Sequence, residues 1–268
     1  MKGEKSINLT TFKSHKYLHD VCTIKRYTNR HYKVTQHRAL RNRGVEDPNF
    51  TPKGSAGNTA KLTNSISRTR SKVFELAECN TWELFVTFTL DPQKYERHDL
   101  KKFIKDLSHF IRNYKASKGT DIKYLLIPEQ HQDGAWHMHG FLKGLPIDHL
   151  TPFRKSDRIP KKIRTRLEKG IPVFTWTTYA ERFGFADIEA IENPEAVSKY
   201  ITKYITEDLG RAVCDLNAHM YYCSKGLQKA ELLLVAPMYR ELQNPDYENE
   251  HVRVKNCHSY EEAEACVL

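Results

Sequence analysis

Two histidines separated by one residue, His137 and His139, have the types and spacing that most directly indicate chemistry in this chain. The dipeptide Asp133-Gly134 precedes them, and Asp-Gly between two apolar runs predicts the turn of a β-hairpin. The histidines would then lie on a strand, where residues i and i+2 point to the same face about 7 Å apart. Two imidazoles at this spacing can hold one divalent metal ion. The alternatives are a structural zinc site, or two histidines that are only partly buried and hydrogen-bonded.

A third metal ligand is expected on the other strand of this hairpin. Glu129 lies before the turn and can supply a carboxylate, while His131 has the same strand parity and is the reserve candidate. Two histidines and one carboxylate leave open positions on an ion, and phosphate oxygens could take them. The same ligand set serves non-haem iron oxygenases, but that chemistry uses neither paired tyrosines nor a basic surface.

Two tyrosines at helical spacing, Tyr200 and Tyr204, follow later in the chain, with Lys203 beside them. Residues i and i+4 share one face of a helix, so both hydroxyls would lie together. A tyrosine hydroxyl is a weak nucleophile until a cation lowers its proton affinity, and a metal ion or Lys203 could do this. The alternative is that both tyrosines belong to an ordinary core stripe of the helix.

The net charge of +10 is distributed unevenly along the 268 residues. Residues 1–72 hold 16 Lys and Arg against 4 Asp and Glu, whereas residues 237–268 hold 3 against 7. A basic head suggests a polyanion as partner, although a solubilising tail has the same composition. A second basic stretch, between residues 145 and 170, is either a DNA-contacting loop or a solvated face. Its candidate DNA-binding residues are Arg154, Lys155, Arg158, Lys161, Lys162 and Arg164.

Several classes of protein are disfavoured by what the sequence lacks. With 39% hydrophobic residues the chain should be globular, yet no apolar run is long enough to cross a membrane, so no membrane partner is expected. The N-terminus shows no secretory pattern, and six cysteines without a CxxC pair indicate reduced thiols in the cytoplasm. No GxxxxGK[ST] phosphate loop occurs, so a fused helicase is not expected.

The order of predicted elements indicates an α+β domain with an antiparallel sheet. Strands are predicted over 84–90, 122–127, 135–142, 173–177 and 185–191, and helices over 64–78, 100–114, 179–183 and 194–209. Residues 1–60 should have little regular structure. The predicted division is a basic N-terminal arm with a possible helix (1–80), a catalytic domain (81–210) with a basic insertion (145–170), and a C-terminal extension with an acidic tail (211–268).

Three motifs follow one another along the chain. The first is Phe85-Val86-Thr87-Phe88-Thr89-Leu90, the second is His137-Met138-His139, and the third is Tyr200-Ile201-Thr202-Lys203-Tyr204. In this order they resemble the motifs of the rolling-circle replication initiators, the Rep proteins of the HUH endonuclease superfamily found in small phages and bacterial plasmids. The tyrosines follow the histidines, as in Rep proteins and unlike conjugative relaxases. Glu129 stands where the third ligand of this family is often found. The resemblance covers residues 82–210.

The resemblance implies a fold, a cofactor and a reaction. The fold would be a five-stranded antiparallel sheet with flanking helices, of the ferredoxin-like type, and the cofactor would be Mg²⁺ or Mn²⁺. Tyr200 would attack single-stranded or extruded origin DNA and keep the 5′ phosphate, leaving a 3′ hydroxyl as a primer, and Tyr204 could act in a second transesterification. A host helicase and polymerase would be partners in the bacterial cytoplasm. Two rival functions remain open: a non-catalytic DNA-binding replication protein and a metal-dependent phosphodiesterase that uses water. A single-strand transposase of the same superfamily is disfavoured, because those proteins are much shorter and usually carry one tyrosine.

Overall fold

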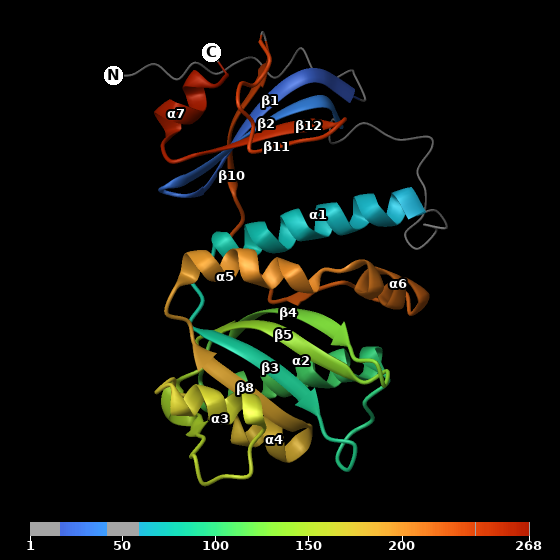
Figure 1. Cartoon of the computed structure of the whole chain (residues 1–268), viewed down its shortest axis with the longest axis vertical. Coiled ribbons are helices and arrows are strands. Elements are labelled where there is room, and N and C mark those ends of the chain that lie inside the picture. The colour runs from blue at the N-terminus through green and yellow to red at the C-terminus, as the bar shows by residue number, and fades with distance from the viewer. Residues whose placement is uncertain (1–16, 42–58, 239, 268) are drawn as a thin grey trace. The chain divides into compact units, whose positions relative to one another are not determined.

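Two compact units make up the chain in the computed structural model, which describes residues 17–41, 59–238 and 240–267 (Figure 1). The first unit joins the two ends of the chain, residues 1–53 and 229–268, and the second contains residues 54–228. Both contain helices and antiparallel strands, which confirms the predicted α+β class. This grouping differs from predicted boundaries at residues 80 and 210, because both ends of the chain supply strands to one sheet.

The first unit is a five-stranded antiparallel sheet in the order β10-β1-β2-β12-β11, with the short helix α7 packed against β2 and β12. Its elements are β1 (Tyr17–Thr28), β2 (His31–Arg41), β10 (Glu231–Pro237), β11 (Tyr247–Glu248), β12 (Val252–Cys257) and α7 (Tyr260–Ala265). The prediction of little regular structure over residues 1–60 was therefore wrong for 17–41. The apolar side of the β1–β2 hairpin, with Ile24 and Val34 fully buried, is completed by β10, β12 and α7 from the far end of the chain.

The second unit is built on a seven-stranded antiparallel sheet in the order β6-β7-β8-β3-β5-β4-β9. Its strands are β3 (Leu84–Leu90), β4 (Lys123–Gln130), β5 (Trp136–Lys143), β6 (Thr151–Pro152), β7 (Phe174–Thr175), β8 (Gly184–Ala190) and β9 (Tyr222–Cys223). Four long strands form its centre, and the other three have two residues each. The sheet therefore differs from the single five-stranded sheet that the resemblance implied, although its antiparallel pairing agrees.

Six α-helices of the described chain belong to this second unit. They are α1 (Thr59–Glu78), α2 (Leu100–Lys118), α3 (Lys161–Glu168), α4 (Thr177–Arg182), α5 (Pro194–Ile201) and α6 (Glu207–Asp215), with short 3-10 turns η2 (Ile147–His149) and η3 (Thr202–Tyr204). Helix α2 matches its sequence pattern closely. Asp99 caps its first turn by accepting from the Lys102 N–H, and Gly119 ends it in a left-handed conformation at φ +64°.

The two faces of the central sheet have different chemistry, and the alternation along β3 shows how they separate. Leu84, Val86 and Phe88 are buried on one face, which packs against α2 and the aromatic side chains around α4. Thr87 and Thr89 point to the opposite face. Helix α5 and the turn η3 lie on this second face, and Figure 1 shows α2 on the other side of the sheet. The polar face is therefore the one that meets the tyrosine helix.

Candidate active site

The histidine pair lies at the centre of the polar face, where the register of the sheet fixes its neighbours. His137 stands directly opposite Thr89 on β3, and His139 stands opposite Thr87. The Nδ1 atom of His137 is 3.0 Å from the Thr89 hydroxyl, and that of His139 is 3.1 Å from the Thr87 hydroxyl. A hydrogen bond at Nδ1 fixes the ring and leaves Nε2 for a ligand, which is how histidines at metal sites are usually oriented. The predicted strand and its same-face histidines are confirmed.

Glu129 reaches this pair from the neighbouring strand. It stands opposite His137 on β4, and its Oε2 atom lies 2.6 Å from Nε2 of His139 and 3.9 Å from Nε2 of His131. The hydrogen bond with His139 is the main reason that the pKa of Glu129 lies below its usual value. The carboxylate is therefore ionised at neutral pH and placed among three imidazoles.

The His137 imidazole is held in a form that suits metal binding. The ring of His131 stacks on that of His137 at 3.7 Å between centroids. Burial, and then the nearby His131 and His139, lower the pKa of His137 to about 4, so its ring is neutral at pH 7. Neutral imidazole is the form that coordinates metal. Even so, no group of three His, Cys, Asp or Glu residues in the described parts of the chain is arranged to hold an ion as it stands. One physical reason is that the Glu129 carboxylate is hydrogen-bonded to the nitrogen that a metal would take.

The segment that carries the tyrosines is not the single helix from Pro194 to Leu209 that the sequence predicted. Helix α5 ends at Ile201, η3 follows, and Ile205 has non-helical angles. The chain restarts at Thr206, whose hydroxyl accepts from the Leu209 N–H at the start of α6. An N-cap residue inside the predicted helix therefore divides it.

Both tyrosines nevertheless reach the histidine face. The Tyr204 ring stacks on His139 with 4.2 Å between centroids and 10° between planes. The hydroxyls of Tyr200 and Tyr204 are 3.3 Å apart, and Tyr200 packs edge-on against Phe85. The ammonium of Lys203 lies 3.4 Å from the Tyr200 ring centroid. Two elements that are distant in the sequence thus bring paired phenols and paired imidazoles together.

Neighbouring groups affect the two hydroxyls in opposite directions. Burial raises the pKa of Tyr200, but the hydrogen bonds of Lys203 and Tyr204 and the charge of Lys203 outweigh it, so this pKa lies below its usual value. Burial and the hydrogen bond to Tyr200 raise the pKa of Tyr204 well above its usual value. Tyr200 is therefore the hydroxyl that loses its proton more readily.

A known protein family matches the segment that carries these residues. Residues 83–209 match the model of a family described as Replication-associated protein ORF2. This segment belongs to that family of phage replication initiators. The match spans all three motifs and confirms the resemblance drawn from them. The chain has no significant match among curated proteins or among solved structures.

A cluster that sequence reasoning missed lies beside the tyrosines of this replication-associated domain. Asp187 on β8 stands opposite Thr87 on β3 and is buried. The guanidinium of Arg166 on α3 binds both Asp187, at 3.1 Å, and Glu189. Burial raises the pKa of Glu189 although Arg166 opposes the shift. The charge of Arg166 also acts on Tyr204. The alternation of Asp187 and Glu189 was the one local signal, but their partner could only be found once β8 was placed beside β3.

The predicted DNA-binding residues of the replication-associated domain occupy α3 and the segment before it. All six are exposed: Arg154, Lys155, Arg158, Lys161, Lys162 and Arg164. The charge of Lys162 acts on Tyr200 and lowers its pKa slightly. Arg164 also binds the carbonyl oxygens of Lys155 and Asp157, so it orders the segment that carries Arg154, Lys155 and Arg158.

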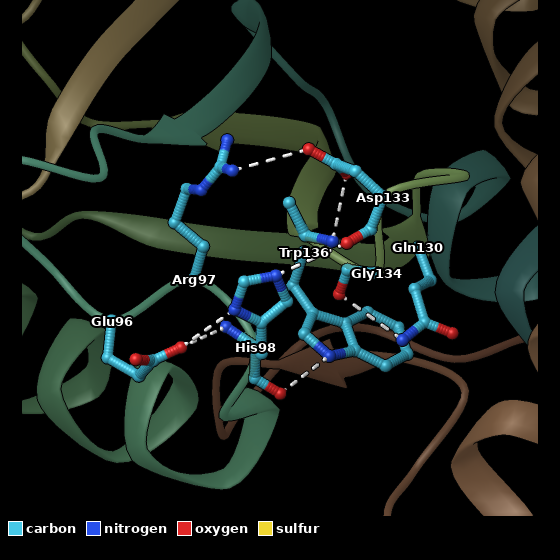
Figure 2. Close-up of polar contacts among 8 residues, drawn as sticks. Glu96, Arg97, His98, Gln130, Asp133, Gly134 and Trp136 are labelled. Carbon is cyan, nitrogen blue, oxygen red and sulfur yellow. Dashed lines mark hydrogen bonds and ion pairs between the residues drawn. The ribbon is translucent and has the colours of Figure 1, made fainter.

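The hairpin that carries the histidines is held at its turn by the loop before α2 (Figure 2). Gly134 has φ +82°, which confirms the predicted Asp-Gly turn. The indole of Trp136 donates to the His98 carbonyl at 3.2 Å, and the Nε2 atom of His98 lies 3.2 Å from the Asp133 carbonyl. Arg97 pairs with the Asp133 carboxylate at 3.3 Å. These contacts fix the strand one residue before His137.

Within residues 17–41, 59–238 and 240–267, no helix is long and apolar enough to span a membrane.

Proposed function

We propose that this chain nicks one strand of origin DNA by tyrosine transesterification and so starts rolling-circle replication. The observation that carries the proposal is the stacking of Tyr204 on His139, with the Tyr200 hydroxyl 3.3 Å from that of Tyr204. An ordinary core stripe does not explain this placement, because Tyr200 is 43% exposed. The family match over residues 83–209 supports a role in phage DNA replication, and it implies binding of origin DNA.

In the proposed step, the Tyr200 oxygen attacks the phosphorus of one phosphodiester. The phenolic proton is lost, the bond from phosphorus to the 3′ oxygen breaks, and that oxygen gains a proton. The products are a 5′-phosphotyrosine link and a free 3′ hydroxyl. Lys203 favours the attack because its charge stabilises the Tyr200 phenolate. Tyr204 is placed to act in a second transesterification that closes the displaced strand.

His137, His139 and Glu129 would hold a divalent ion, with His131 in reserve. The threonine bonds at both Nδ1 atoms support this assignment, because they direct the Nε2 atoms away from the sheet backbone. Two imidazoles with one carboxylate suit Mn²⁺, and open positions filled by water and phosphate suit Mg²⁺. When bound, the ion would polarise the phosphate under attack.

The exposed cations of α3 and its preceding segment would bind the backbone of single-stranded or extruded DNA. This part of the proposal rests on Arg154, Lys155, Arg158, Lys161 and Lys162, which have charged groups in solvent. A host helicase would open the strand, and a host polymerase would extend the 3′ hydroxyl.

A denaturing gel tests the reaction. The full chain is incubated with Mn²⁺ and end-labelled single strands that tile the replicon carrying its gene. We expect one strand to give a covalent adduct that disappears in Tyr200→Phe and in His137→Ala. Tyr124→Phe is the matched control, since Tyr124 lies on the other face of the sheet and should leave the adduct unchanged.

Two outcomes would point to the rival functions. Cleavage without an adduct would favour a hydrolase that uses water. Retention of the strands on a native gel without cleavage would favour a non-catalytic DNA-binding protein.

A further inference from the structure

Two phenylalanines of the second unit form a stacked pair that the hydrophobic core does not include. The rings of Phe153 and Phe185 lie 5.4 Å apart with 22° between their planes. Both are half-buried, and neither belongs to the core cluster or packs against it. Among the described residues, each has its only aromatic contact with the other. Two large apolar rings held face to face outside the core indicate a surface made for contact with something else.

The register of the sheet places this pair beside the candidate active site. Phe185 stands opposite Thr89, Thr89 stands opposite His137, and His137 stands opposite Glu129. Residues paired in this way share one face of an antiparallel sheet. Phe185 is therefore two strands from His137 on the histidine face, roughly 10 Å away by strand spacing. Nucleotides adjoining a phosphate held beside His137 would span this distance.

Close backbone contacts hold the two chain segments that carry these rings. Gly184 begins β8 at φ +145°, and a Cβ atom there would collide with the backbone of Thr89 and Asp91. The strand can therefore approach β3 closely, and Phe185 follows at once. On the other side, the Phe153 N–H donates to the Val173 carbonyl at 2.9 Å. A contact surface whose rings are already positioned loses little entropy on binding.

Cations adjoin the aromatic pair. Arg154 and Lys155 directly follow Phe153 and are exposed, and Arg164 orders their segment through the Lys155 carbonyl. Aromatic faces next to a basic groove are the features with which proteins bind unpaired nucleic acid, since each base offers a face for stacking. Paired and stacked bases of a duplex do not offer that face.

We propose that Phe153 and Phe185 form a stacking platform for an unpaired DNA base next to the phosphodiester at the histidine site. This inference rests on the proposed function, which identifies that phosphodiester as the bond that is nicked. The platform would hold the strand in register while the cations hold its backbone. It would thereby contribute to the choice of the bond that Tyr200 attacks.

The test measures base stacking without cleavage. The full chain in EDTA is titrated into two labelled ten-nucleotide probes of equal charge, oligo(dT) and an abasic deoxyribose-phosphate strand, and anisotropy gives both dissociation constants. We expect the wild type to bind oligo(dT) about tenfold more tightly than the abasic strand, the size of one stacked base. Phe185→Ala and Phe153→Ala should each remove most of this preference while affinity for the abasic strand stays the same.

Matched variants separate stacking from folding. Phe185→Tyr keeps a ring and should keep the preference, whereas Phe185→Leu keeps apolar area and should lose it. Ile171→Ala removes an exposed apolar side chain elsewhere in this unit and should change neither constant. The salt dependence should remain that of the wild type in the phenylalanine variants and become shallower in Lys155→Ala.

An unchanged preference in both alanine variants would overturn the platform, as would an equal loss of affinity for both probes. Since EDTA prevents metal-dependent cleavage, these results do not depend on nicking. A preference that requires both rings, in a chain that forms no adduct with any strand, would support the platform while the proposed nicking fails.

Discussion

Tyr200 and Tyr204 carry the same hydroxyl group in different surroundings. Tyr200 is 43% exposed with a lowered pKa, whereas Tyr204 lies against His139 with a raised one. An exposed phenol that ionises more easily is the better first nucleophile, because DNA can reach it and less free energy is needed to remove its proton. Tyr204 is half-buried, and its ring stacks on His139. This difference supports the proposal that Tyr200 makes the first attack.

A change at Lys203 tests that assignment. Lys203 holds the pKa of Tyr200 below its usual value, so Lys203→Met should raise this pKa and leave less phenolate at neutral pH. We expect adduct formation at pH 7 to slow by about 10²-fold, the typical effect of losing one group that stabilises charge in an active site. The rate should recover as pH rises, so the profile moves to higher pH. Single-turnover adduct formation with Mn²⁺ across the pH range measures this. Lys203→Arg is the control that keeps the charge, and a slowing of equal size at every pH would contradict the role.

Sequence spacing was sufficient to locate the site residues whose partners are close to them in the sequence. The Asp-Gly turn located His137 and His139, and helical spacing located Tyr200 and Tyr204. Thr89 was visible in the first motif, but its bond to His137 depends on which strands pair and in what register. The binding of Arg166 to Asp187 likewise joins α3 to β8, and no local pattern specifies that contact.

At the scale of elements, the helix that follows the tyrosines shows how one glycine lets two helices pack closely. The predicted helix over 194–209 would end just before Gly210, yet Gly210 lies inside α6. A Cβ atom at Gly210 would lie 3.1 Å from Leu62 and 3.2 Å from Ile66, both on α1. The glycine therefore permits close packing of two helices. Close packing there holds α6 against α1.

This packing predicts the effect of a larger residue at position 210. Gly210→Val should lower the free energy of unfolding by about 1–3 kcal/mol, because its methyl groups overlap α1. Leu62→Ala should make room, so the loss caused by Gly210→Val should be smaller in that background. Urea unfolding followed by circular dichroism measures both, with the wild type and Leu62→Ala as references. Equal losses in the two backgrounds would show that the side chain of Leu62 is not what limits the space.

At the scale of the whole molecule, the two ends of the chain form one unit. The strands of this unit lie at the two ends of the sequence. Because the N-terminal residues are rich in Lys and Arg, the alternation of apolar and polar side chains along β1 and β2 was not recognised, and the sequence suggested an unstructured arm. Residues 1–53 and 229–268 together hold 16 Lys and Arg against 12 Asp and Glu. Much of the basic excess of the N-terminal segment is therefore balanced within its own unit, as in the pair formed by Arg26 and Glu231. Deletion of residues 1–60 would remove two strands of a sheet as well as positive charge.

Residues 54–228 contain every group of the proposed reaction, so they should fold and react without the other unit. The cut after Gln228 keeps the contacts that hold this end of the chain, since the Asn80 side chain bonds both the N–H and the carbonyl of Gln228. We expect this fragment to unfold in one cooperative thermal transition and to form the adduct within about tenfold of the full-chain rate, because removing surface outside an active site leaves its geometry intact. The same fragment with Tyr200→Phe is the control. A fragment that melts cooperatively but forms no adduct, while the full chain forms it, would show that the unit built from the chain ends takes part in the reaction.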